Sequence, residues 1–139
     1  MPLAVPVVRS ERCLLHEPPG RIWVGVRTPA PDVPERQQQI LSALADAPVV
    51  EAVPHDDACL TAVHDEALLT FLASAWAEWE GAGLPDDPGQ DGVVPYLFPL
   101  PGLLGGCEPL APRATWARTG MFCADTITLL GPRTWEAAR

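Results

Sequence analysis

Residues 34–53 read PERQQQILSALADAPVVEAV, and this stretch decides the fold class that the sequence predicts. Pro34 and the acid after it suit the first turn of a helix, where a missing N–H costs little and the helix dipole favours negative charge. Ile40 and Leu44 then keep the helical spacing of apolar residues. The run at 49–53 is rich in valine and is followed by a proline, which is typical of a strand that ends there. The stretch therefore predicts a helix followed by a strand.

Another strand is expected ahead of this helix, in the apolar run at 3–8. Pro6 is tolerated there only at a sheet edge or just before the strand begins. Strands that alternate with helices favour a parallel sheet, so the fold class that we expect is α/β. Two or three strands would leave such a sheet with unpaired backbone and a half-covered face. We therefore expect residues 1–139 to form an incomplete part of one domain.

Asp65 is expected to begin the longest helix, which runs to about residue 80 and ends in glycines. We interpret its apolar stripe as the buried face: Leu68, Leu69, Leu72, Trp76 and Trp79. Asp56 or Asp57 suits the cap of a shorter helix ahead of it, and Thr134 is the expected N-cap of a last helix. That last helix stops after about one and a half turns without glycine or proline, which we interpret as a cut in a longer chain.

Two long stretches lack a regular period and are expected to be loops, over 14–34 and 84–118. The chain has 17 prolines, which favour stiffened loops over general disorder. Loops of this length are uncommon in a compact domain unless they have a function. The stretch at 122–130 is mixed and predicts either a strand or an extended loop.

All nine basic residues are arginines, and against 18 acidic residues they leave a net charge of -9. An acidic surface repels phosphate groups and anionic lipids, so we expect neither a nucleic-acid partner nor a membrane partner. Arg9 interrupts the apolar opening before it reaches the length of a signal-peptide core, and no run approaches a membrane span. We therefore expect a cytoplasmic protein.

Cysteine and histidine spacing predicts no metal site and no cofactor in this chain. A zinc site needs three or four converging ligands, and neither the four cysteines nor the three histidines have such spacing. Disulfides remain an alternative for an even number of cysteines, although a chain without an export signal more often keeps free thiols. Cys59 ahead of His64 is the nearest pair to a nucleophile and a base, but no third group orients them.

Three stretches together resemble the N-terminal third of bacterial acetylpolyamine amidohydrolases and their histone deacetylase relatives. The first is HEPPGRIWVG at 16–25, with TPAPDVPER at 28–36. The second is VHDEALLTFL at 63–72 with AWAEW after it, similar to the family's VHDxxYxxFL and AWxxW. The third is GMFCADT at 120–126 with GPRTWEAA at 131–138, similar to a GYY segment followed by PGTWEAA. The order and spacing of these stretches, over nearly the whole chain, carry the resemblance.

The resemblance implies the N-terminal portion of an arginase/deacetylase-like fold, in which a parallel sheet of about eight strands carries zinc at its C-terminal strand ends. The implied reaction is hydrolysis of an acetyl-amide, in an acetylpolyamine or acetyl-lysine substrate, by a zinc ion that polarises the acyl oxygen and activates water. The family's zinc ligands, paired histidines and tyrosine lie downstream of the TWEAA helix. None of these roles can therefore be assigned here, and we expect a chain that is inactive alone while its full-length parent binds zinc.

In the family, this part of the chain builds the wall and rim of the substrate tunnel, and a long loop helps to form a dimer. The resemblance therefore implies that 14–34 is the first rim loop and that 84–118 is the dimer segment. The 120–122 stretch would form a turn of the rim, and Asp125 would hold a substrate amine or backbone. The implied rim residues are His16, Trp23, Trp116, Met121, Phe122 and Asp125. A surface or packing role is the alternative for each of them.

The chain departs from the polyamine-specific pattern at several positions. An acid of the family's first loop falls at Arg21, and two later acids fall at Trp116 and Ile127. The usual tyrosine after the VHD motif is Leu68. Loss of these acids weakens the inference that the substrate is a polyamine cation.

Three functions stay open on the sequence alone. The first is a deacetylase part that supplies tunnel rim and scaffold. The second is a non-enzymatic module that pairs with a separate catalytic half or caps a related enzyme. The third is an acidic hydrolase that uses cysteine and histidine. Zinc binding, partner capture and thiol alkylation distinguish the three.

Overall fold

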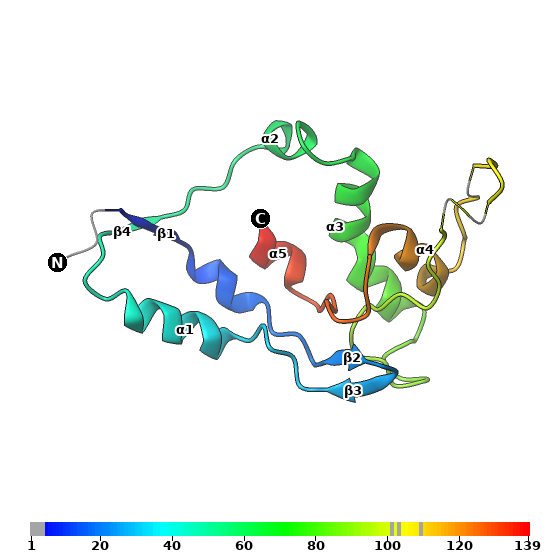
Figure 1. Ribbon diagram of the computed structural model, residues 1–139, viewed down its shortest axis with the longest axis horizontal. Coiled ribbons are helices and arrows are strands. Elements are labelled where there is room, and N and C mark those ends of the chain that lie inside the picture. The colour runs from blue at the N-terminus through cyan, green and yellow to red at the C-terminus, as the bar shows by residue number, and fades with distance from the viewer. Residues whose placement is uncertain (1–4, 101, 103, 109) are drawn as a thin grey trace.

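The computed structural model describes residues 5–100, 102, 104–108 and 110–139. Figure 1 shows an elongated arrangement, with the β1–β4 pair at one end and the longest helix, α3, toward the other. The elements in chain order are β1 (Val7–Arg9), the 3-10 helix η1 (Glu11–Leu15), β2 (Arg21–Trp23), β3 (Val26–Thr28), α1 (Pro34–Ala43), β4 (Val49–Glu51), α2 (Asp57–Thr61), α3 (Glu66–Gly81), α4 (Thr115–Phe122) and α5 (Thr134–Ala138).

Strands β1 and β4 form a parallel pair, with Val7 opposite Val49 and Arg9 opposite Glu51. Helix α1 lies between them in the chain, so the expected α/β class with a parallel strand pair is confirmed. Of the strand expected at 3–8, residues 3 and 4 lie outside the described part of the chain. Strand β1 begins after Pro6, because a proline inside it would remove a ladder hydrogen bond.

Part of the 14–34 segment is not the loop that we predicted, because it contains the end of η1 and a β-hairpin. Strands β2 and β3 pair antiparallel, with Arg21 opposite Thr28. The turn between them places Val24 at φ 51° and Gly25 at φ 76°. Two-residue hairpin turns favour Asn-Gly or Gly-Gly, and a β-branched residue at positive φ is unusual. The sequence therefore lacked the usual signal for this hairpin.

Helix α3 begins where we predicted, with the Asp65 carboxylate accepting a hydrogen bond from the Ala67 N–H at 2.7 Å. Its fully buried residues are Phe71, Ala75 and Trp79. Of the predicted stripe, only Trp79 is fully buried, while Leu72 and Trp76 pack at the edge of the core. The predicted buried face was therefore rotated away from the real one.

The position of the buried face follows from what packs against it. The rings of Phe71 and Phe122 stack with centroids 4.7 Å apart and planes at 19°. Val93 and Leu130 form an isolated antiparallel bridge, and both belong to the buried cluster around Phe71. These partners come from segments far along the chain, so the local helical period could not show which side of α3 they would cover.

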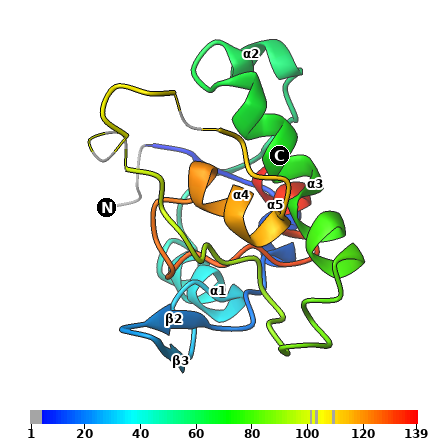
Figure 2. The ribbon, with the colours of Figure 1, turned by 90° about the vertical axis from the view of Figure 1, so that its right-hand side faces the viewer.

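Helix α4 corrects two predictions, because it occupies the end of the 84–118 segment and turns Gly120, Met121 and Phe122 into helix rather than turn. Its sequence, TWARTGMF, contains two threonines and a glycine, which lower intrinsic helix propensity. Packing against α3 compensates for this, and Figure 2 shows α4 beside α3. The 122–130 stretch is loop after α4 apart from the bridge at Leu130.

The caps of the short helices also differ in part from the prediction. Asp56 is the N-cap residue of α2, as one of our two alternatives had it, but its side chain makes no capping hydrogen bond. Arg133 rather than Thr134 is the N-cap residue of α5. The Thr134 hydroxyl reaches back to accept a hydrogen bond from the Gly131 N–H at 2.8 Å, so it satisfies a backbone donor just ahead of the helix.

Candidate functional site

The β2–β3 hairpin is held against the turn that carries Asp125. The Ile22 N–H donates to the Thr126 carbonyl oxygen at 3.0 Å, and the Thr126 hydroxyl donates to the Ile22 carbonyl oxygen at 2.9 Å. This reciprocal pair places the strand of Trp23 next to the turn of Asp125. Two of the predicted rim residues, 102 positions apart in the chain, therefore lie on neighbouring segments.

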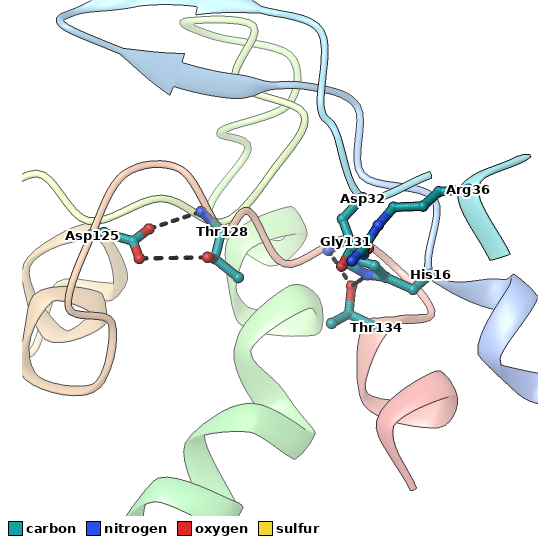
Figure 3. Close-up of polar contacts among 7 residues, drawn as sticks. All are labelled: His16, Asp32, Arg36, Asp125, Thr128, Gly131 and Thr134. Carbon is teal, nitrogen blue, oxygen red and sulfur yellow. Dashed lines mark hydrogen bonds and ion pairs between the residues drawn. The ribbon is translucent and has the colours of Figure 1, made fainter. Parts of the chain in front are cut away.

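The carboxylate of Asp125 is fixed by its own turn (Figure 3). One oxygen accepts hydrogen bonds from the Ile127 N–H at 2.7 Å and the Thr128 N–H at 2.8 Å. The backbone bond from Thr128 does most to hold the pKa of Asp125 below its ordinary value, partial burial opposes it, and the Ile127 bond lowers it further. Asp125 is thus an exposed, ionised carboxylate at neutral pH, which suits a cationic or N–H donor ligand.

Trp23 is exposed at the end of β2, with 53% of its surface accessible. The Arg21 guanidinium lies 5.7 Å from the centroid of its ring, within the range of a cation–π contact. One face of the indole is therefore already occupied by a cation of the chain itself. Arg21, at the position where the resemblance implied an acid, thus contacts a predicted rim residue.

The three predicted rim residues of α4 have different surroundings. Trp116 is exposed and lines an apolar cavity of about 340 Å³ together with Trp79, Leu84 and Tyr96. Phe122 stacks on Phe71 and packs against the core, so its main contact is structural. Met121 is half-buried on the same helix. Successive side chains on a helix point about 100° apart, so Met121 and Phe122 leave α4 in different directions.

His16 lies in a separate group at the junction of η1, α1 and α5 (Figure 3). Its Nδ1 is 3.0 Å from the Thr134 hydroxyl, and its Nε2 is 3.9 Å from the Asp32 carboxylate. The Thr134 hydroxyl also accepts a hydrogen bond from the Gly131 N–H, so it links the His16 ring to the start of α5. Nε2 faces Asp32, and Arg36 pairs with the same carboxylate at 2.6 Å.

A polar cavity between α3 and α4 was not predicted from the sequence. It has a volume of about 520 Å³, and its lining includes Asp65, Ser74, Glu78 and Arg118. Arg118 pairs with Glu78, which also accepts a hydrogen bond from the Ser74 hydroxyl at 2.7 Å. The pair joins residues 40 positions apart on different helices, so no local pattern in the sequence could have indicated it.

Cys123 follows α4 and is poorly suited to act as a nucleophile. Burial, together with the nearby Asp125 charge, raises the pKa of Cys123 to about 11. It is therefore a neutral thiol at physiological pH, and the thiolate is the reactive form. All four cysteines are free, and Cys13, Cys59 and Cys107 are exposed.

The residues that the structure describes do not form a metal site. Among them there is no group of three or more histidine, cysteine, aspartate or glutamate side chains placed to hold a metal ion. The donor set that zinc requires is thus not assembled in the described part of the chain. No helix in that part is both long and apolar enough to span a membrane.

The chain is similar in both sequence and fold to proteins of one kind. The chain is 29% identical over 135 residues to an acetylpolyamine amidohydrolase from Mycoplana ramosa, and 31% identical over 126 residues to one from Burkholderia pseudomallei. The chain resembles an acetylpolyamine amidohydrolase. A crystal structure of the acetylpolyamine aminohydrolase from Burkholderia pseudomallei superposes with a TM-score of 0.81 and 28% identity over 97% of this chain. No family model matches the chain.

The similarity covers only part of each acetylpolyamine amidohydrolase. The chain spans 37% of the Mycoplana ramosa protein and 34% of the Burkholderia pseudomallei protein, and it covers 37% of the solved chain. The chain therefore folds as about a third of such a protein does. The roles that we predicted for His16, Trp23, Trp116, Met121, Phe122 and Asp125 stay predictions.

Proposed function

We propose that this chain is the scaffold and substrate-rim part of a deacetylase that hydrolyses acetyl-amides of the acetylpolyamine or acetyl-lysine type. The observation that carries the proposal is the superposition over 97% of this chain, at 28% identity, on a protein named for acetylpolyamine hydrolysis. Similarity that extends through loops as well as helices supports a shared working geometry and not only a shared fold class. The rim, in this proposal, includes the hairpin of Trp23 and the turn of Asp125.

Asp125 is the rim residue with the clearest chemical use. An ionised carboxylate that keeps one oxygen largely free attracts the protonated amine or the amide N–H of an extended substrate. Trp23, on the strand that pairs with this turn through Ile22, supplies an aromatic surface for the aliphatic part of such a substrate. Phe122 and His16 act in packing, given their contacts with Phe71 and Thr134.

The reacting centre in this proposal is supplied from outside the described residues. A zinc ion in the complete enzyme would supply Lewis-acid polarisation of the acyl oxygen and an activated water molecule. The described residues assemble no donor set for it, so the chain contributes access to the substrate and support for the fold. Isolated from its partner, it is expected to be inactive.

The test is to add zinc to the purified chain and to assay an acetyl-lysine peptide and an acetylpolyamine. We expect neither stoichiometric zinc binding nor turnover. The same assays are then run with the complementing part of an acetylpolyamine amidohydrolase present, where turnover is expected. Activity of the chain alone, or inactivity of a well-formed complex with zinc bound, would contradict the proposal.

The alternative is a non-enzymatic interaction module that pairs with a separately encoded catalytic half. The two functions differ in what the complex does. If removal of the Asp125 carboxylate leaves the turnover of the complex unchanged, the chain acts only as an interaction module.

We also propose the 84–118 segment as a surface for a second copy of the chain. It exposes several large apolar side chains, including Tyr96, Leu97, Phe98 and Trp116. Clusters of exposed aromatic residues are typical of protein interfaces. The paired substitution Tyr96→Ser and Leu97→Ser is expected to convert a dimer to a monomer in light scattering. Val63→Ser, at an exposed position outside the 84–118 segment, is the control and should leave the dimer intact. An unchanged mass in the paired variant would reject a dimer through this surface.

The site of action that we propose is the cytoplasm. Four free thiols support this location, because thiols stay reduced in the cytosol. Fractionation of the producing cells tests it.

A further inference from the structure

Arg21 differs from most arginines of the chain because no acidic side chain pairs with it. Seven of the nine arginines pair with a carboxylate, whereas Arg21 and Arg113 have no such partner among the described residues. Arg113 is exposed to water, but Arg21 is half-buried. Partial burial of a charge is unfavourable unless the charge is paired. The surroundings of Arg21 therefore suit an anionic ligand.

Two contacts hold the guanidinium of Arg21 in place and leave most of its donors unused. Its Nε–H donates to the Thr28 hydroxyl at 3.1 Å, across the hairpin from β2 to β3. The guanidinium carbon also lies over the Trp23 ring, 5.7 Å from the centroid. These contacts use one N–H donor, so the donors on the terminal nitrogens are left for a ligand. Such a fork matches the two oxygens of a carboxylate, and its fixed position lowers the entropy cost of binding.

A negative charge lies on the segment next to Arg21 but does not pair with it. Ile22, the neighbour of Arg21, exchanges two hydrogen bonds with Thr126, which directly follows Asp125. In the described part of the chain, the Asp125 carboxylate forms no ion pair and is held by N–H groups of its own turn. The hairpin lies at the edge of the molecule in both Figure 1 and Figure 2. The proposed rim thus carries a cation and an anion on neighbouring segments, each without an oppositely charged partner.

We propose that Arg21 is a specificity-determining residue that binds the α-carboxylate of free acetyl-lysine, while Asp125 holds the α-ammonium group. This inference rests on the proposed function and names its substrate class. An amino acid carries these two opposite charges on one carbon atom, so it complements an unpaired cation and anion on neighbouring segments. An acetylpolyamine has no carboxylate, and its further ammonium groups are repelled by the charge of Arg21.

The first experiment titrates the 139-residue chain with Nε-acetyl-lysine and, separately, with its C-terminal amide, which lacks the carboxylate. Proton–nitrogen correlation NMR at constant ionic strength follows the Arg21 Nε–H and the Trp23 indole N–H, the latter assigned with Trp23→Phe. We expect the free acid to shift both signals and to bind about tenfold more tightly than the amide, as the loss of a charge-assisted hydrogen bond implies. Equal binding of the two probes, or no shift of these signals by either, overturns the proposal.

A substitution then tests whether Arg21 itself makes the distinction. Arg21→Gln removes the cation, and the Trp23 indole signal reports binding in this variant. The preference for the free acid should disappear. Arg133→Gln removes the same charge from an exposed arginine of α5 that pairs with Glu136, so it is the control and should keep the preference. A preference that persists in Arg21→Gln overturns the proposal, and the two-probe titration of the unmutated chain decides the matter if that variant unfolds.

Turnover separates this proposal from the proposed function. In the zinc-loaded complex with the complementing part of an acetylpolyamine amidohydrolase, kcat/KM should be about tenfold higher for the free acid than for its amide, and Arg21→Gln should make the two values equal. An active complex that treats both probes alike contradicts the role of Arg21 and leaves the proposed function standing. Selective binding of the free acid by the chain, in a complex that shows no turnover, does the reverse.

Discussion

The imidazole of His16 lies 3.0 Å from the hydroxyl of Thr134, although 118 positions separate them in the chain (Figure 3). The contact joins the end of η1 to the start of α5, and these two short elements pack closely against each other. Arg12 and Glu136 add a longer ion pair at 3.8 Å between the same elements. Neither element is long enough to be stable on its own, so each depends on the other.

Replacing His16 with alanine is expected to destabilise the fold by about 1 kcal/mol, since it leaves a half-buried hydroxyl without its side-chain partner. The melting temperature should fall by several degrees, measured by circular dichroism. Thr134→Ser keeps the hydroxyl and is the matched control, whereas Thr134→Val should cost more than His16→Ala, because it also leaves the Gly131 N–H without its acceptor. Equal stability of all three variants would show that the contact contributes nothing.

Gly120 is required because the Leu97 carbonyl lies where a side chain would be. A Cβ at position 120 would overlap that oxygen and lie 2.7 Å from the carbonyl carbon. Gly120→Ala is therefore expected to displace the segment at 97–98 or to destabilise the fold by roughly 1–3 kcal/mol, as over-packed sites do. Gly81→Ala, at the end of α3 with open space around it, is the control and should be neutral or slightly stabilising. Chemical denaturation of both variants measures the difference.

The same contact explains why α4 escaped prediction. Read locally, a glycine beside a threonine argues against a helix at 119–120. In the fold, Thr119 is fully buried and its hydroxyl donates to the Thr115 carbonyl at 2.9 Å, while Gly120 lets the loop approach. Tertiary contacts made at 97–98 therefore decide the structure of residues some twenty positions later.

Elements whose stability is local were predicted well. The proline-led start of α1, the capping aspartate of α3 and the valine run of β4 each carry their own signal, and the structure contains all three. The candidate site was harder, because its pieces meet only through long-range hydrogen bonds such as those between Ile22 and Thr126. The resemblance to a family located the segments, but a single sequence does not encode which side chains converge.

Removing the charge of Asp125 should change how the free energy of unfolding depends on pH in the acid range. Because its pKa is lowered in the folded chain, its contribution is fully present above the ordinary aspartate pKa near 4 and is lost as the pH falls through the lower folded value. Asp125→Asn should therefore flatten the fall in stability below about pH 4. Asp86→Asn, at an exposed acid in another turn, is the control. If both variants keep the parental acid profile, the turn does not depend on the Asp125 charge.

Cys123 should make the fold sensitive to alkali. Its pKa is raised to about 11 in the folded chain, so between the ordinary thiol value near 8.5 and pH 11 the unfolded chain loses a proton that the folded chain keeps. Stability must then fall as the pH rises through this window. Cys123→Ala should remove that part of the slope, measured by denaturant unfolding at pH 8 and pH 10. Cys107→Ala, at an exposed cysteine, is the control.

The rate of alkylation tests the same property of Cys123. A protonated, half-buried thiol should react more slowly at pH 8 than the three exposed thiols. Equal rates would mean that Cys123 is neither shielded nor held neutral.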